Sequence, residues 1–119
     1  MGQAIIKCKD ATIAAETCEE LWIMKSPHED YFFSGVDIVT NSSGSHHELR
    51  KLAHKLDMVK YASTHHGGVY MYSNLKGCDG GRMYFDGAST VTMNNKLMVQ
   101  LPQFEVGELD IQVAVLDLD

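Results

Sequence analysis

The sequence predicts an α+β protein, built in layers from a mixed β-sheet and one long helix. Short apolar or alternating segments, typical of strands, clearly outnumber the segments with helical periodicity. In the first half of the chain, strands alternate with helical turns, and in the second half they follow one another through hairpin turns. Alternation favours parallel pairing and hairpins are antiparallel, so a mixed sheet covered by helices is expected.

The first two strands are predicted to form a hairpin that ends just before a cysteine. Residues 3–8 and 11–17 are apolar or alternating, and Lys9-Asp10 between them suits a tight turn. After the cysteine, Pro27 disfavours a helical conformation in the residue before it and indicates a loop. The elements predicted next are a loop over 25–30, a helical turn over 31–34, a strand over 36–40 and a small-residue loop over 41–45.

The one long helix is predicted over about 46–64. Its apolar residues recur with a period near 3.6, at Leu49, Leu52, Ala53, Leu56, Val59 and Ala62. Charged residues take its other faces: Arg50, Lys51, Lys55 and Asp57. Ser45 is a plausible N-cap, because Glu48 follows three residues later as in a capping box.

The second half of the chain is predicted to be mainly strands. Asn94-Asn95 is a good two-residue hairpin turn between two β-prone segments. The last strand, 109–116, alternates strongly between apolar and polar residues. The remaining predictions are strands over 69–73, 89–93 and 96–100, a glycine-rich loop over 74–81 and a partly extended run over 82–87.

Composition predicts a single cytoplasmic unit over residues 1–119. The net charge of −6 argues against binding to nucleic acid or to an anionic membrane, since both favour a basic face. No apolar run is long enough to span a bilayer, and no signal peptide is visible. The cysteines, Cys8, Cys18 and Cys78, are odd in number and widely spaced, which suits a reducing compartment.

Cys18 is the first candidate for chemistry. It follows a predicted strand and precedes two carboxylates and the apolar pair Leu21-Trp22, as at the start of a helix. Backbone N–H groups at such a junction favour a thiolate and can bind an oxyanion. The alternative is a buried structural cysteine, since free cysteine is among the most often buried residue types.

Other motifs give weaker indications. The pairs His46-His47 and His65-His66 suggest a metal site, but adjacent helical residues point about 100° apart and make poor co-ligands, so no metal is expected. The glycines in 77–81 match no phosphate-binding motif.

Seven runs of residues, in this order, resemble a known family. They are ETCEELW (16–22), SPH (26–28), TNSSGSHHELRK (40–51), GGVY (67–70), GCDG (77–80), YFDG (84–87) and AVLDL (114–118). The pattern resembles the later half of the glutaminase domain of eukaryotic-type glutamine-dependent NAD synthetases. That domain is part of the nitrilase (carbon–nitrogen hydrolase) superfamily, and the similarity runs over almost the whole chain.

The resemblance implies half of an αββα sandwich and a set of site residues. Cys18 matches the nucleophile that attacks the side-chain amide of glutamine, releasing ammonia through a thioester. The Glu19 backbone N–H would form part of the oxyanion hole. Ser45 and Lys51 match residues that hold the substrate glutamine, although by themselves they read as a helix cap and a solvated helix face.

The resemblance also implies what this segment lacks. The family's glutamate base and lysine come before the cysteine strand, where this chain has only 17 residues. The ATP-dependent synthetase domain, which would use ATP and Mg and convert deamido-NAD to NAD, is absent, so no cofactor is expected here. We therefore expect the isolated chain to be nearly inactive, and to pair with a second copy or with the missing N-terminal half-domain.

Two alternatives remain open at this point. One is a half-domain without catalysis, which serves as a binding or assembly module. The other is a hydrolase that pairs Cys18 with a nearby histidine, His46 or His47.

Overall fold

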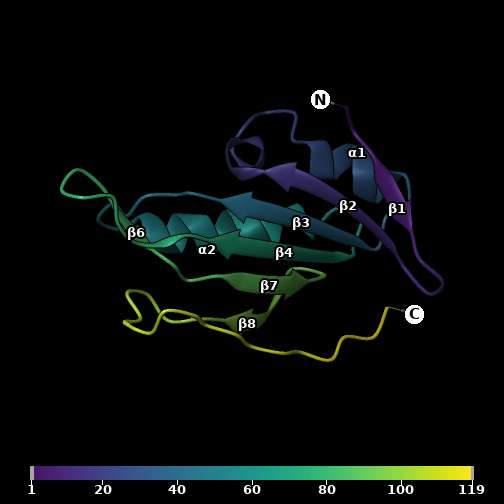
Figure 1. Ribbon diagram of the computed structural model, residues 1–119. Helices are drawn as coiled ribbons and strands as arrows, with labels where there is room; N and C mark the ends of the chain where they lie inside the picture. The colour runs from purple at the N-terminus through teal and green to yellow at the C-terminus, as the bar shows by residue number, and fades with distance from the viewer. Residues whose placement is uncertain (1, 119) are drawn as a thin grey trace.

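A computed structural model describes residues 2–118; the ends of the predicted unit, residues 1 and 119, lie outside this range. Six strands form one sheet in the order β1-β2-β3-β4-β7-β8, with two helices and a separate two-stranded hairpin, β5-β6 (Figure 1). The sheet strands are β1 Ile5–Lys7, β2 Thr12–Thr17, β3 Ile38–Ser43, β4 Val69–Asn74, β7 Thr90–Met93 and β8 Lys96–Gln100. The other elements are the 3₁₀-helix η1 Cys18–Leu21, the helices α1 Pro27–Phe33 and α2 Lys51–Ala62, and the strands β5 Lys76–Cys78 and β6 Tyr84–Asp86.

The sheet is mixed, as predicted. β2, β3 and β4 are parallel, and the pairs β1-β2, β4-β7 and β7-β8 are antiparallel. Thr17 at the end of β2 pairs with Ser42 near the end of β3. The parallel register therefore brings the residues that follow these two strands to the same edge of the sheet.

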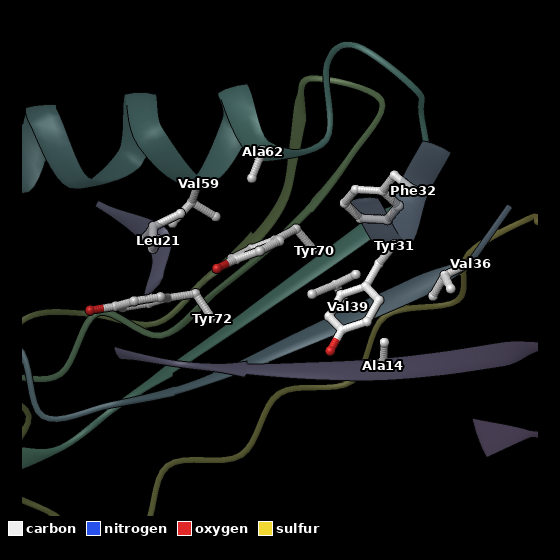
Figure 2. Packing of buried hydrophobic residues seen from close by; sticks show 10 residues of the cluster. All are labelled: Ala14, Leu21, Tyr31, Phe32, Val36, Val39, Val59, Ala62, Tyr70 and Tyr72. Carbon is white, nitrogen blue, oxygen red and sulfur yellow. The ribbon is translucent and has the colours of Figure 1, made fainter. Parts of the chain in front are cut away.

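Both helices pack on one face of the sheet. Figure 2 shows Val59 and Ala62 of α2 on the same side of the sheet as the rings of Tyr70 and Tyr72. Tyr31 and Phe32 of α1 belong to the same core cluster. The whole core cluster consists of Ala14, Leu21, Tyr31, Phe32, Val36, Val39, Val59, Ala62, Tyr70 and Tyr72. Alternate strand residues point to the opposite face, which no helix covers within residues 2–118. No helix in this range is both long enough and apolar enough to cross a membrane.

The predicted helix over 46–64 is wrong in its extent, because α2 begins only at Lys51. The backbone N–H of His47 donates to the carbonyl of Tyr84 at 2.6 Å, and His46 forms an isolated β-bridge with Phe85. These backbone groups are therefore engaged by a distant strand before a helix can use them. Arg50, at φ 69°, is the residue that caps α2, and Ser45 is not its N-cap.

The apolar stripe predicted for this helix is also partly wrong. Leu49 precedes α2 and is 89% exposed, whereas Lys55, predicted on a charged face, is 2% exposed. Burial of a lysine needs a compensating partner. Here its ammonium group lies 3.0 Å from the carboxylate of Asp86.

Two further differences concern segments outside α2. The loop predicted over 25–30 contains the start of α1, because Pro27 occupies the first helical position, where its missing N–H costs nothing. The strand predicted over 109–116 is extended but pairs with no strand within residues 2–118, and Figure 1 draws it as part of a long tail beyond β8. The Asn94-Asn95 turn is confirmed, with φ values of 49° and 65°.

Candidate active site

Cys18 lies at the end of β2 and is the first residue of η1. The helical turn predicted after it is a short 3₁₀-helix, held by a hydrogen bond of 2.6 Å from the Thr17 N–H to the carboxylate of Glu20. Cys18 itself has φ 39°, in the left-handed region that side chains disfavour. Its side chain is half-buried, unlike the exposed Cys8 and Cys78.

A cavity of about 260 Å³ opens beside Cys18. Its lining consists of Cys18, Glu19, Trp22, Gly44, Ser45, His46 and Lys51. The four site residues named from the sequence therefore all reach one cavity, although they come from two segments more than 20 residues apart. The parallel register of β2 and β3 is what joins these segments.

Ser45 and Lys51 are held in the cavity wall by different groups. The Ser45 N–H donates to the side-chain oxygen of Asn74 at 2.8 Å, and the Ser45 carbonyl accepts from the Asn74 amide at 3.1 Å. The ammonium group of Lys51 donates to the His46 carbonyl at 3.1 Å and lies 3.8 Å from the carboxylate of Glu48. A polar group and a cation thus line the same cavity as the Cys18 thiol.

The two histidines considered as partners of Cys18 lie in different surroundings in the structure. His46 lines the cavity, with its Nε2 2.6 Å from Glu48. His47 instead lies 3.4 Å from Asp86 and packs edge-on against Phe104. Within residues 2–118 no three histidine, cysteine or acidic side chains are grouped as a metal site would require.

A buried polar network, which the sequence analysis missed, lies behind Cys18. The carboxylate of Glu16 accepts the His28 backbone N–H at 2.9 Å, contacts the His28 ring at 3.0 Å, and accepts a short hydrogen bond from the Tyr70 hydroxyl. The amide of Asn41 donates to the Tyr70 oxygen at 3.0 Å, and its own oxygen accepts the Cys18 N–H at 2.9 Å. Glu16, His28 and Asn41 are each at most 3% exposed.

The charge of Glu16 is stabilised by its partners. Burial raises the pKa of Glu16, but the hydrogen bonds from His28 and Tyr70 outweigh burial and hold the pKa below its ordinary value. Burial, together with the neighbouring Glu16 charge, raises the pKa of Tyr70 well above its ordinary value, so this hydroxyl stays protonated. One signal of this network was present in the sequence, since Glu16 occupies the same alternating face of its strand as the buried Ala14.

A second buried cluster, also missed, surrounds Asp86. Its carboxylate is contacted by Lys55 at 3.0 Å, by the Gln103 amide at 2.7 Å and by the Asn74 amide at 3.2 Å. Asn74 also holds Ser45, so the cluster supports the far wall of the cavity. Sequence spacing could not reveal it, because these partners are 12 to 31 residues from Asp86.

Replacing Glu16 by glutamine is expected to lower the free energy of unfolding by about 2–4 kcal/mol at pH 7, since a buried group with several donors loses its charge. The folded-state pKa of Glu16 lies below its ordinary value, so its contribution is fully present above that value and is lost as the pH falls through the folded-state pKa. Urea unfolding of both proteins between pH 7 and pH 3 should therefore show the difference shrinking in acid.

Glu19→Gln is the control for the Glu16 prediction, because Glu19 is an exposed carboxylate three residues away. It should change the free energy of unfolding by less than about 0.5 kcal/mol at any pH. A difference between wild type and Glu16→Gln that stays constant from pH 7 to pH 3 would contradict the assignment of a stabilised carboxylate.

No family model matches the chain, but its sequence is similar to those of individual proteins. It is 44% identical, over all 119 residues, to the putative glutamine-dependent NAD(+) synthetase of Schizosaccharomyces pombe, and covers 17% of that protein. It is 46% identical, over 118 residues or 99% of the chain, to the glutamine-dependent NAD(+) synthetase of Saccharomyces cerevisiae, and covers 16% of it. The chain thus spans about one sixth of the length of the curated relatives it matches.

Solved structures share the fold of this chain. A glutamine-dependent NAD(+) synthetase from Cytophaga hutchinsonii matches 86% of this chain and 16% of its own, with 31% identity and a TM-score of 0.72. The NAD+ synthetase of Acinetobacter baumannii matches 88% of this chain and 20% of its own, with a TM-score of 0.80 and 21% identity. A Nesterenkonia amidase of the nitrilase superfamily matches 90% of this chain and 39% of its own, with a TM-score of 0.74 and 15% identity. The chain is therefore homologous to a segment of glutamine-dependent NAD(+) synthetases and has the fold seen in nitrilase-superfamily amidases.

Proposed function

We propose that this chain is the cysteine-bearing part of a glutaminase, a carbon–nitrogen hydrolase that releases ammonia from glutamine. The observation that carries the proposal is the convergence of Cys18, Glu19, Ser45 and Lys51 on one cavity. A thiol, a helix-start N–H, a hydroxyl and an ammonium group together supply what amide hydrolysis by a nucleophile requires. The names of the relatives add that the substrate amide is that of glutamine.

In the proposed reaction the Cys18 thiolate attacks the carbonyl carbon of the glutamine side chain. The carbonyl oxygen becomes an oxyanion, which the Glu19 N–H stabilises. The C–N bond then breaks, the nitrogen takes up a proton and leaves as ammonia, and a thioester remains on Cys18. Water attacks the thioester, which yields glutamate and restores the thiol.

Ser45 and Lys51 are proposed to hold the glutamine in place for this attack. Lys51 donates one N–H to the His46 carbonyl, and 20% of its side chain is exposed. Its other N–H groups can therefore donate to a substrate carboxylate. Ser45 is buried and its backbone is fixed by Asn74, so this residue of the cavity wall lacks the mobility of a surface loop.

The base that removes the thiol proton is proposed to come from outside the cavity lining. His46 is a poor candidate because, within residues 2–118, its ring forms a hydrogen bond to Glu48 and none to the Cys18 thiol, and the Glu19 side chain is exposed. By the family resemblance, a glutamate and a lysine of the preceding half-domain would supply the base and the acid. We therefore propose that residues 1–119 form a partial domain with little activity by themselves, and that its ammonia serves an ATP-dependent step elsewhere.

A partner is proposed to cover the sheet face opposite the helices. The apolar side chains on this face include Met71, which is 40% exposed, and Ile13 and Ile38, which pair across β2 and β3. Four alternate residues of the extended tail, Leu109, Ile111, Val113 and Val115, are each at least 74% exposed. Exposed apolar area of this extent favours association, with the complementary half-domain or with a second copy of the chain.

The proposed function is tested by measuring ammonia release from glutamine. We expect almost none from the chain alone, and Cys18-dependent release from a fusion that places the preceding segment of the S. pombe relative before residue 1. Cys18→Ala should abolish release, because removal of a side-chain nucleophile lowers kcat by about a million-fold in other hydrolases. His46→Gln should leave it largely intact.

Other results would favour the other functions. A correctly folded fusion without turnover would support the binding or assembly module, whereas loss of activity in His46→Gln would support a Cys–His pair. Sedimentation velocity of the unfused chain checks the partner separately, and a monodisperse monomer would contradict the covered sheet face.

A further inference from the structure

We propose that Asn41 is a positioning residue for Cys18: its buried carboxamide holds the Cys18 backbone in the conformation that presents the thiol to the cavity. The inference rests on the proposed function only in that Cys18 is the reacting residue. Its evidence is a set of hydrogen bonds within residues 2–118, and its test requires no turnover.

The first observation is the unfavourable backbone of Cys18. Its φ of 39° lies in the left-handed region, which costs a residue other than glycine on the order of 1–2 kcal/mol. Such a conformation persists only where the surroundings impose it. Asn41 supplies this constraint, because its side-chain oxygen accepts the Cys18 N–H at 2.9 Å and its amide nitrogen lies 3.5 Å from the Cys18 carbonyl oxygen.

The second observation is that the carboxamide of Asn41 has only one satisfactory orientation. Its oxygen faces two donors, the Cys18 N–H and the Ser43 hydroxyl at 2.8 Å. Its nitrogen faces only acceptors: the Tyr70 oxygen at 3.0 Å, the carboxylate of Glu16 at 3.4 Å and the Cys18 carbonyl oxygen at 3.5 Å. Turning the amide over would oppose donor to donor and acceptor to acceptor, so the oxygen is held toward Cys18.

The third observation is that the acceptors of Asn41 are themselves fixed by charge. The Tyr70 hydroxyl donates its only proton to Glu16, which leaves its oxygen free to accept from Asn41. Glu16 is in turn fixed by the backbone and ring of His28 on α1. Cys18 is thus connected through Asn41 to Tyr70, a core residue of β4, and through Glu16 to His28 of α1.

A purely structural network would stabilise the fold without affecting the thiol, and this difference can be measured. The readout is the rate of alkylation of Cys18 by iodoacetamide, divided by the rate at Cys8 in the same sample, both quantified by mass spectrometry of their peptides. Cys8 and Cys78 are exposed, so they serve as internal references. The variants are Asn41→Ala, which removes the clamp, and Tyr70→Phe, which removes only one support of it.

Thr92→Ala is the matched control. Thr92 is a fully buried polar residue whose hydroxyl donates to the Val59 carbonyl at 3.0 Å, and none of its side-chain hydrogen bonds involves Cys18, Asn41 or Tyr70. Its backbone pairs with Tyr70 across β4 and β7, and an alanine keeps that backbone pairing. It should lower the free energy of unfolding by about 1–2 kcal/mol and leave the rate ratio unchanged. Any general effect of destabilisation on alkylation is thereby measured and subtracted.

We expect a wild-type ratio that differs from unity, because Cys18 is half-buried and held. In Asn41→Ala the ratio should move toward unity by about threefold or more, since a released thiol reacts according to its exposure. Tyr70→Phe should move the ratio in the same direction by less, and it keeps the test decisive if Asn41→Ala does not fold. The proposal is overturned by a wild-type ratio of one, by an unchanged ratio in a folded Asn41→Ala or Tyr70→Phe, or by an equal shift in Thr92→Ala.

Discussion

Replacing Lys55 by methionine is expected to lower the free energy of unfolding by about 3–5 kcal/mol, because one partner of a buried ion pair is removed and the other is left charged. Lys55 and Asp86 are each 2% exposed, and their charged groups are 3.0 Å apart. The ammonium group also donates to the Gly87 carbonyl at 3.3 Å. Burial raises the pKa of Asp86, but Lys55 and Gln103 outweigh it and hold that pKa below its ordinary value, so Asp86 stays charged.

Urea unfolding at pH 7, followed by circular dichroism, measures the effect of Lys55→Met. Lys60→Met is its control on the same helix, since Lys60 lies 3.0 Å from Asp57 in a pair whose side chains are 35% and 71% exposed. An exposed pair of this kind contributes about 0–1 kcal/mol, so Lys60→Met should hardly change the free energy of unfolding. Equal losses in the two variants would show that burial of Lys55 has no special energetic weight.

Replacing Gly68 by alanine is expected to cost about 2–5 kcal/mol, by combining an unfavourable backbone with a steric overlap. Gly68 has φ 97°, and a Cβ atom there would lie 2.5 Å from Cε1 and 2.8 Å from Cδ1 of the Phe32 ring. Phe32 is 5% exposed and belongs to the core, so its ring has little room to withdraw. The thermal unfolding midpoint, measured beside the urea midpoint, gives the loss.

Gly80→Ala separates the two causes in the Gly68 prediction. Gly80 has φ 92°, close to that of Gly68, but a Cβ atom there would meet nothing within 4 Å. Its cost should be that of the backbone alone, about 1–2 kcal/mol. If Gly80→Ala costs as much as Gly68→Ala, the overlap with Phe32 has no part in the loss.

The strands were largely predictable from the sequence, whereas the start of the main helix was not. Period-two alternation and β-branched residues are local signals, and they located β2, β4, β7 and β8 within a residue or two. The helix start at Lys51 depends on a β-bridge between His46 and Phe85, which are 39 residues apart. A contact at that separation has no local signature, and it overrode an apparently good capping box.

The candidate site divides in the same way. Cys18, Glu19, Ser45 and Lys51 belong to contiguous motifs, so the sequence and its resemblance to a family could name them. Glu16, His28, Asn41 and Tyr70 are joined by hydrogen bonds across 12 to 54 residues, and only the fold brings them together. Lys55 was misplaced for a related reason, because the carboxylate that permits its burial lies 31 residues further on.

The order of the strands in the sheet also bears on how the protein is made. Each strand of the series β1, β2, β3 and β4 lies beside the strand that precedes it in the sequence, and β7 and β8 continue the series. A nascent chain leaving the ribosome can therefore add each strand to an edge that already exists, without waiting for later residues. Cys18 precedes Lys51 and Asn74 in the sequence, so its cavity is complete only after both of these residues have followed it out of the ribosome, and the thiol gains its surroundings after its own strand has been made.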